Sequence, residues 1–176
     1  MGSNLSNVSD PNERSTYSSL DPYDHLNTVK EIDLKRLEGT WWVMAHAPTE
    51  TENGCDRSIR ILTYDSEKNH IKMKTQCWRC DEISSEIDDV ITFPYPNDMG
   101  KTKALSIQKK NDNLLWFHEI DYDNYVIVGD PKNHILWIWT RQEKVDRELV
   151  PFFEDKSAEY GYDPENLIVD SVNIFT

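Results

Sequence analysis

Short runs of alternating hydrophobic and polar residues fill most of the chain from residue 38 onward. In one run Ile71, Met73, Thr75 and Cys77 alternate with polar residues, so one face of that segment is buried and the other is wet. Clusters of turn-forming residues separate these runs. The alternation predicts eight strands, at residues 38–47, 57–65, 70–78, 83–93, 103–109, 114–120, 125–128 and 134–140.

One later segment, residues 146–160, repeats its large apolar residues at helical rather than strand spacing. Asp146 is the expected N-cap, and Gly161 suits the left-handed position just beyond the helix. Because Pro151 lacks a backbone N–H, we expect the first turn to be irregular or the helix to begin near this residue. A short strand at 167–169 is expected to follow.

The order of these elements predicts an all-β fold. Short strands at regular spacing are typical of a sandwich or of an up-and-down barrel. A single late amphipathic helix cannot cover both faces of a large sheet, but it can pack against the outside of a closed barrel. The helix therefore favours a barrel over an open sheet.

Residues 1–28 contain many serines and few apolar side chains, and they show no periodic pattern. We expect a disordered N-terminal tail over 1–28 and a folded domain over 29–176. The first six residues also fit the N-myristoylation pattern, with Gly2 as the acceptor. A chance match or an expression-vector remnant is the alternative interpretation. A single acyl chain would give only weak peripheral membrane association.

Composition excludes several classes of protein. The chain of 176 residues has 19 Lys and Arg against 32 Asp and Glu, a net charge of −13. This charge argues against nucleic acid as a partner and against a polybasic membrane-binding surface. Six tryptophans exclude a fully disordered chain. Because the sequence shows no apolar leader, we expect a cytoplasmic location, and a secreted or periplasmic one if a signal was removed.

Three motifs, in order, resemble those of the lipocalin family. Residues 39–41 are similar to the Gly-x-Trp signature that opens the first barrel strand, and residues 121–125 are similar to the second motif. Arg141, at the end of the last long strand, is similar to the third. The run at 129–131 and the residues after the helix resemble the branch of bacterial lipocalin, apolipoprotein D and the plant temperature-induced lipocalins.

The resemblance implies an eight-stranded antiparallel up-and-down β-barrel, with one C-terminal helix packed outside and a short final strand. It also implies that Gly39, Trp41 and Arg141 close the narrow end of the barrel instead of binding a ligand. In lipocalins the guanidinium stacks over the indole, a cation–π contact worth about 0.5–2 kcal/mol.

A barrel of eight strands is just wide enough to hold one small ligand. If strand alternation is counted from Trp41 and from Arg141, small apolar and aromatic side chains point inward. We expect the lining to contain Val43, Ala45, Ala47, Ile61, Met73, Phe117, Tyr125, Trp137 and Trp139. A charged head of the ligand would then lie at an open end formed by loops 48–56 and 94–99. A packed core without a cavity is the alternative.

The resemblance and the expected lining together predict binding and transport or storage of a small hydrophobic molecule, such as a fatty acid, a lysophospholipid or a pigment. We expect a monomer or a weak dimer without a cofactor. An enzyme on the same scaffold is the alternative from another class, acting through Cys77, Cys80, Glu119 or Tyr125. A partner-binding barrel with a collapsed pocket is a third hypothesis.

Three cysteines, Cys55, Cys77 and Cys80, allow several interpretations. The Cys-x-x-Cys spacing of the last two could mark a redox dithiol or half of a metal site. A redox dithiol normally lies at a helix N-terminus, whereas this motif lies at a strand end. A disulfide of Cys55 with Cys77 or Cys80 is the first expectation and free thiols are the second, and no metal is expected.

Overall fold

The computed structural model describes residues 25–169 and 173–175. Gly2 and most of the expected tail lie outside the described residues. The strands are β1 Gly39–His46, β2 Arg57–Asp65, β3 His70–Arg79, β4 Glu82–Thr92, β5 Lys101–Ser106, β6 Asp112–Asp121, β7 Tyr125–Asp130, β8 Ile135–Thr140 and β9 Ile168–Val169. The helices are α2 Leu34–Leu37 and α3 Leu149–Glu159, with a single 3-10 turn η1 at Pro164–Asn166.

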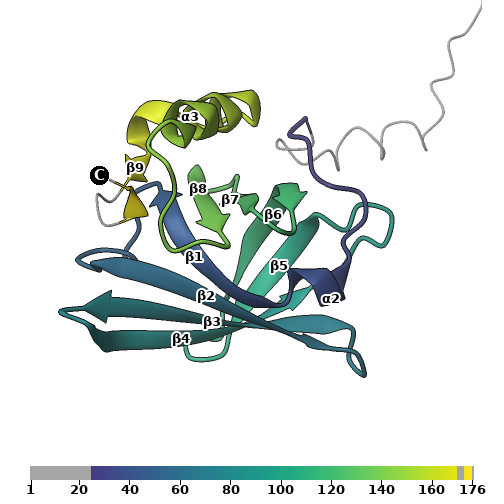
Figure 1. The fold of residues 1–176 in the computed structure, drawn as a ribbon. Helices are drawn as coiled ribbons and strands as arrows, with labels where there is room; N and C mark the ends of the chain where they lie inside the picture. The colour runs from purple at the N-terminus through teal and green to yellow at the C-terminus, as the bar shows by residue number, and fades with distance from the viewer. Residues whose placement is uncertain (1–24, 170–172, 176) are drawn as a thin grey trace, which may run out of the picture.

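Strands β1 to β8 form a closed ring (Figure 1). Each strand pairs antiparallel with the next, and β1 closes the ring by pairing with β2 through residues 39–42 and with β8 through residues 42–46. The expected eight-stranded antiparallel barrel is therefore confirmed. Because successive strands reverse direction, their connections alternate between two ends of the barrel.

We name these ends by their loops. The closed end contains the start of β1, helix α2 and the connections after β2, β4, β6 and β8, and the open end contains the connections after β1, β3, β5 and β7. The loop 94–99 follows β4 and lies at the closed end, where the Met99 N–H donates to the Lys30 carbonyl at 3.1 Å. The expectation that this loop joins loop 48–56 at the open end is wrong, because an odd number of strands separates the two loops.

Helix α2 was not expected from the sequence. Asp33 is its N-cap and accepts a hydrogen bond from the Arg36 N–H at 3.2 Å. Its two leucines, Leu34 and Leu37, are buried under the closed end. One helical turn is too short to show a hydrophobic period, so α2 could not be predicted from the sequence.

Residues just before the expected domain start at residue 29 contact the barrel. The Asn27 carbonyl lies 2.5 Å from the His118 ring, and the buried Thr28 hydroxyl donates to Asp98 at 2.6 Å. The Val29 N–H donates to the Phe117 carbonyl at 3.0 Å. This segment therefore lies against the outside of the barrel wall.

Helix α3 starts later than its expected N-cap. Glu148 precedes the first helical residue and makes no side-chain capping bond, so the expected cap at Asp146 is wrong. Pro151 is the third residue of the helix, within the first turn, where its missing N–H has no intrahelical partner to lose. Gly161 follows the helix with φ +87°, the left-handed conformation expected there.

Helix α3 packs against the outside of the barrel, as expected. Phe153 is buried with Met44 of β1 and Ile138 of β8. The helix is also held by Glu119 of β6, which accepts hydrogen bonds from Lys156 at 3.0 Å and from the Tyr160 hydroxyl at 2.8 Å. Across the described ranges, no helix has the length and apolar character needed to cross a membrane.

Among the described residues three β-bulges interrupt the pairing of the barrel strands, and the bulges in β1 and β6 change where expected lining residues point. One lies between Val43 and Ala45 in β1, and the other lies between Phe117 and Glu119 in β6. A bulge adds one residue to a strand, so the alternation of inward and outward side chains reverses beyond it. Odd-numbered residues of β1 and β6 therefore face the interior before the bulge, as Val43 and Phe117 do, and face outward after it, as Ala45 and Glu119 do.

Candidate ligand-binding site

The closed end is sealed by Trp41 and Arg141. The guanidinium carbon of Arg141 lies 3.6 Å from the centroid of the Trp41 ring, which is fully buried. The indole N–H of Trp41 donates to the Leu37 carbonyl of α2 at 2.9 Å. Arg141 also donates to the backbone carbonyls of Tyr122 at 2.9 Å and Arg36 at 2.8 Å. The indole N–H of Trp41 and the guanidinium of Arg141 therefore both have hydrogen-bond acceptors.

Gly39 is required where this arginine crosses β1. Its φ of +111° belongs to the region that side chains rarely adopt, and a Cβ there would lie 2.9 Å from Nη1 of Arg141. The glycine thus leaves the space through which the guanidinium reaches the Trp41 ring.

Above this seal, the interior is packed by apolar side chains. Phe117 meets Trp139 edge-to-face at 6.0 Å between ring centroids, and both side chains are fully buried. Val43 belongs to the same core. Further members from the other strands are Leu62, Ile71, Ile91, Val126 and Val128. These side chains form a continuous apolar core from the seal up to Trp139, whose ring also borders the cavity above it.

The open half contains a cavity of about 120 Å³. Its apolar wall includes Met73, Ala104, Leu115, Trp137 and Trp139. Its polar wall includes Arg60, Thr75, Asp89 and Ser106, with Thr51 of the loop after β1 and Lys109 of the loop after β5. The cavity is therefore more polar than the sequence pattern indicated.

Three of the nine expected lining residues, Met73, Trp137 and Trp139, lie in the wall of this cavity. The two tryptophans face inward, as expected from counting every second residue back from Arg141 along β8. Val43 and Phe117 also point inward, but they belong to the packed core beneath the cavity.

Ala45 and Ala47 do not line the cavity, contrary to expectation. Beyond the bulge in β1, Ala45 pairs with Ile138, and both are buried beneath helix α3. His46 instead pairs with Trp137 and shares its face of the sheet. Ala47 lies just after β1 and donates its N–H to the Leu136 carbonyl at 2.8 Å. Counting alternation from Trp41 failed here because the bulge reversed it.

Ile61 and Tyr125 lie on the outer surface of the barrel, again contrary to expectation. Ile61 is flanked by the inward-facing Arg60 and Leu62, and it borders a groove on the outside with Lys72 and Lys74. Tyr125 packs on Phe153 of helix α3, with ring centroids 5.4 Å apart. The sequence pattern placed both residues on the inward face of their strands, and this expectation is wrong.

A buried ion pair between Arg60 and Glu52 lies at the open end and was not expected. Both side chains are almost fully buried, at 4% and 1% exposed. Arg60 also donates to the Ser58 hydroxyl at 2.6 Å. The signal in the sequence was the phase of β2, since a count from Leu62 places Arg60 inside, and a charged side chain inside a barrel needs a partner.

Glu52 stays ionised in this setting. Burial opposes its charge, but Arg60 and the Thr49 hydroxyl outweigh burial and hold the pKa of this carboxyl below its ordinary value. On β4, two strands along the same wall, burial raises the pKa of Asp89 even though Arg60 acts to lower it. The charge of Arg60 is therefore neutralised by Glu52, and Asp89 binds its proton more readily than an exposed aspartate.

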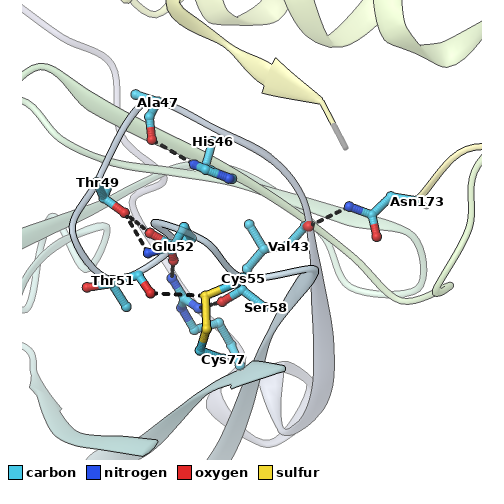
Figure 2. Close-up of polar contacts among 11 residues, drawn as sticks. Val43, His46, Ala47, Thr49, Thr51, Glu52, Cys55, Ser58, Cys77 and Asn173 are labelled. Atoms are coloured by element: carbon cyan, nitrogen blue, oxygen red, sulfur yellow. Dashed lines mark hydrogen bonds and ion pairs between the residues drawn. A yellow bond between two sulfur atoms is a disulfide. The ribbon is translucent and has the colours of Figure 1, made fainter. Parts of the chain in front are cut away.

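Two contacts restrain the loop that carries Glu52 (Figure 2). The Glu52 N–H donates to the Thr49 hydroxyl at 3.1 Å, which folds the loop into a tight turn. Cys55 forms a disulfide with Cys77 of β3, which is one of the two pairings expected, and Cys80 is exposed as a free cysteine. The loop thus holds a carboxylate over the cavity.

The four residues named for an enzyme do not converge on the cavity. Cys77 is consumed in the disulfide, and Cys80 is exposed at the turn after β3. Glu119 accepts a hydrogen bond from the Tyr125 hydroxyl at 2.5 Å, and both lie on the outside of the barrel beneath α3. Within the ranges that the structure covers, no cluster of His, Cys, Asp and Glu could hold a metal ion.

The profile of the lipocalin-like domain family matches residues 32–171, which is most of the chain. The chain belongs to the lipocalin family. This lipocalin is 22% identical over 155 residues to temperature-induced lipocalin-1 of Arabidopsis thaliana, covering 81% of this chain and 80% of that protein. It is 23% identical over 163 residues to the chloroplastic lipocalin of the same plant, covering 80% of this chain and 46% of that protein.

A solved structure shows the same fold. Insecticyanin from the tobacco hornworm Manduca sexta superposes on this lipocalin with a TM-score of 0.65 and 17% sequence identity. The alignment covers 86% of this chain and 85% of insecticyanin. At this identity the likeness supports the barrel and not a particular ligand.

Proposed function

We propose that this lipocalin binds a small hydrophobic molecule in the cavity of its open half, for transport or storage and without chemical turnover. The observation that supports this proposal is the cavity between Met73, Ala104 and the two tryptophans of β8, above an apolar core at the closed end. Family membership supports a binding role as well, since the resemblance to lipocalins implies carriage of such molecules.

The size of the cavity narrows the range of guests. Sites that enclose drug-sized ligands measure about 300–1,000 Å³, and a dry engineered cavity of about 150 Å³ holds benzene. A space of about 120 Å³ therefore suits one ring or a short chain. A fatty acid, a lysophospholipid or a pigment would place only one end in this cavity, with the remainder passing through the open end.

A displacement experiment with a cavity-filling variant tests the proposal. We expect a single-ring fluorescent probe to bind the wild type with a Kd of about 10–100 µM and to be displaced by ethylbenzene. Ala104→Leu fills the cavity wall and should abolish this binding. Ala158→Leu, on the exposed surface of α3, adds the same atoms outside and should leave binding unchanged. Equal binding by the two variants, or no saturable binding, would contradict the proposal.

The disulfide supports an oxidising compartment over the cytoplasmic location expected from the sequence. Disulfides persist outside the cell and in oxidising organelles, whereas cytosolic thiols are kept reduced. Cys55 and Cys77 lie at the open end and would need to be oxidised to hold loop 48–56 in place. Free thiols in protein isolated from its source, measured by mass before and after reduction, would contradict this location.

A further inference from the structure

Two indole N–H groups in the wall of the cavity have no acceptor. Over the part of the chain that the structure describes, Nε1 of Trp137 and Nε1 of Trp139 are buried without a hydrogen-bond partner. Both side chains line the cavity. At the closed end the third inward tryptophan, Trp41, donates to a carbonyl at 2.9 Å. A buried donor without an acceptor destabilises the protein, so the two open-end donors indicate a partner that the barrel itself does not supply.

The two donors lie on one strand face. Trp137 and Trp139 are two residues apart in β8, which places their Cα atoms about 7 Å apart along the strand. The ring of Trp139 also has the Arg60 guanidinium carbon 5.9 Å from its centroid. A guest the size of a single ring can therefore contact both indoles at once.

The charges around the cavity are balanced without a guest. Arg60 is paired with Glu52, and Ser58 accepts a further hydrogen bond from it. Asp89, two strands from Arg60 on β4, adds a negative charge to the cavity wall whenever it is ionised. Lys109 also borders the cavity, but it is exposed and hydrated. An anionic guest would thus bring an uncompensated negative charge into a partly buried space.

We propose that the cavity selects uncharged molecules of about one ring that carry an oxygen acceptor, such as a ketone or an ether, and that the N–H groups of Trp137 and Trp139 donate to this oxygen. The inference rests on the proposed function and specifies its ligand class. The two donors provide the hydrogen bonds, and the pairing of Arg60 with Glu52 leaves the guanidinium charge already neutralised when a carboxylate arrives.

Three probes of nearly equal shape separate the possible ligand classes: acetophenone, ethylbenzene and benzoate. Their Kd values are measured by calorimetry for the wild type and for Trp139→Phe, which keeps an aromatic ring but removes the N–H. The Kd of acetophenone divided by that of ethylbenzene cancels the extra space that the smaller ring creates. We expect this ratio to rise about three- to tenfold in Trp139→Phe, the range of one hydrogen bond.

Two further variants complete the test. Trp137→Phe is expected to raise the ratio in the same direction, and it supplies the comparison if Trp139→Phe does not fold. Trp116→Phe removes an indole that faces away from the cavity, beside Lys101, and should leave the ratio unchanged. We also expect benzoate to bind at least about tenfold more weakly than acetophenone, because its carboxylate is desolvated without a partner.

Three other outcomes of these measurements would overturn the inference. If neither Trp139→Phe nor Trp137→Phe changes the ratio, the indole donors do not contact the ligand, although binding of ethylbenzene would still support the proposed function. Tightest binding of benzoate would mean that a carboxylate replaces Glu52 at Arg60. Failure of all three probes to bind would overturn the proposed function together with this inference.

Discussion

The two ends of this barrel use the same residue types and reach opposite states. At the closed end, Trp41 and Arg141 stack on each other, and the indole N–H and the guanidinium both reach backbone carbonyls. At the open end, Trp139 and Arg60 are also neighbours, but the indole has no acceptor and the arginine is neutralised by a loop carboxylate. The closed-end tryptophan–arginine pair stabilises the fold, whereas the unpaired indole N–H at the open end is the donor that we propose a ligand uses.

The largest effect should come from removing the closed-end indole. We expect Trp41→Ala to lower the free energy of unfolding by about 3–5 kcal/mol, because it deletes a fully buried ring and its hydrogen bond. Trp137→Ala, at the open end, should cost clearly less because that ring is only half-buried. Urea denaturation of the two variants measures the difference, and equal losses would mean that the ends are not distinct.

The disulfide should rank next. Cys55 and Cys77 are 22 residues apart, and a cross-link over a loop of this length is worth about 3 kcal/mol in the chain-entropy model. We expect the double variant Cys55→Ser/Cys77→Ser to lose about this much stability, with faster amide exchange in loop 48–56. Cys80→Ser is the matched control and should behave as the wild type. Faster exchange at the closed end instead would show that the ends are coupled.

Arg141 should have a slightly smaller effect. Arg141→Ala removes the cation–π contact and hydrogen bonds to three backbone carbonyls, so we expect a loss of about 2–3 kcal/mol. Arg141→Lys keeps the charge but not the planar fork, and it should recover only part of the loss. The Kd for ethylbenzene should not change in either variant. Thermal melts equal to the wild type would contradict the assigned sealing role.

The smallest effect concerns acid. His118 is buried against Tyr162 and the Asn27 carbonyl, and burial lowers its pKa to about 4. Because the unfolded state takes up a proton near pH 6.5 and the folded state does not, stability falls as the pH drops through this window. We expect a loss of about 2 kcal/mol between pH 7 and pH 5. Glu52, whose pKa is lowered, should stay ionised over the same range.

The control for this pH dependence is His118→Gln, which cannot titrate in either state. Its stability should change by about 2 kcal/mol less than that of the wild type between pH 7 and pH 5. An unchanged pH dependence in the variant would place the acid-sensitive group elsewhere, for example at the Arg60–Glu52 pair of the open end.

The closed end could be predicted from the sequence because its signals are local. A glycine, a tryptophan and an arginine at fixed motif positions identified the seal, and strand alternation identified the barrel. Along β8, counting back from Arg141 placed Trp137 and Trp139 correctly, because that strand has no bulge in its pairing with β7. Along a strand without a bulge, side chains alternate strictly between the two faces, so one known residue fixes the direction of the others.

The open end could not be predicted to the same depth. The bulge in β1 turned Ala45 outward, and no residue pattern announced it. The ion pair joins Arg60 of a strand to Glu52 of an irregular loop, and a loop has no period from which its partner could be counted. The polarity of the cavity depends on these two features, so the ligand class could be argued only from the structure.

The most direct test of the difference between the two ends is a titration of the ¹⁵N-labelled indole N–H resonances with acetophenone. The account predicts that the Trp137 and Trp139 signals move downfield in a saturable way as they gain an acceptor, while the Trp41 signal stays in place. A titration in which the Trp41 signal moves and the signals of Trp137 and Trp139 do not would contradict it.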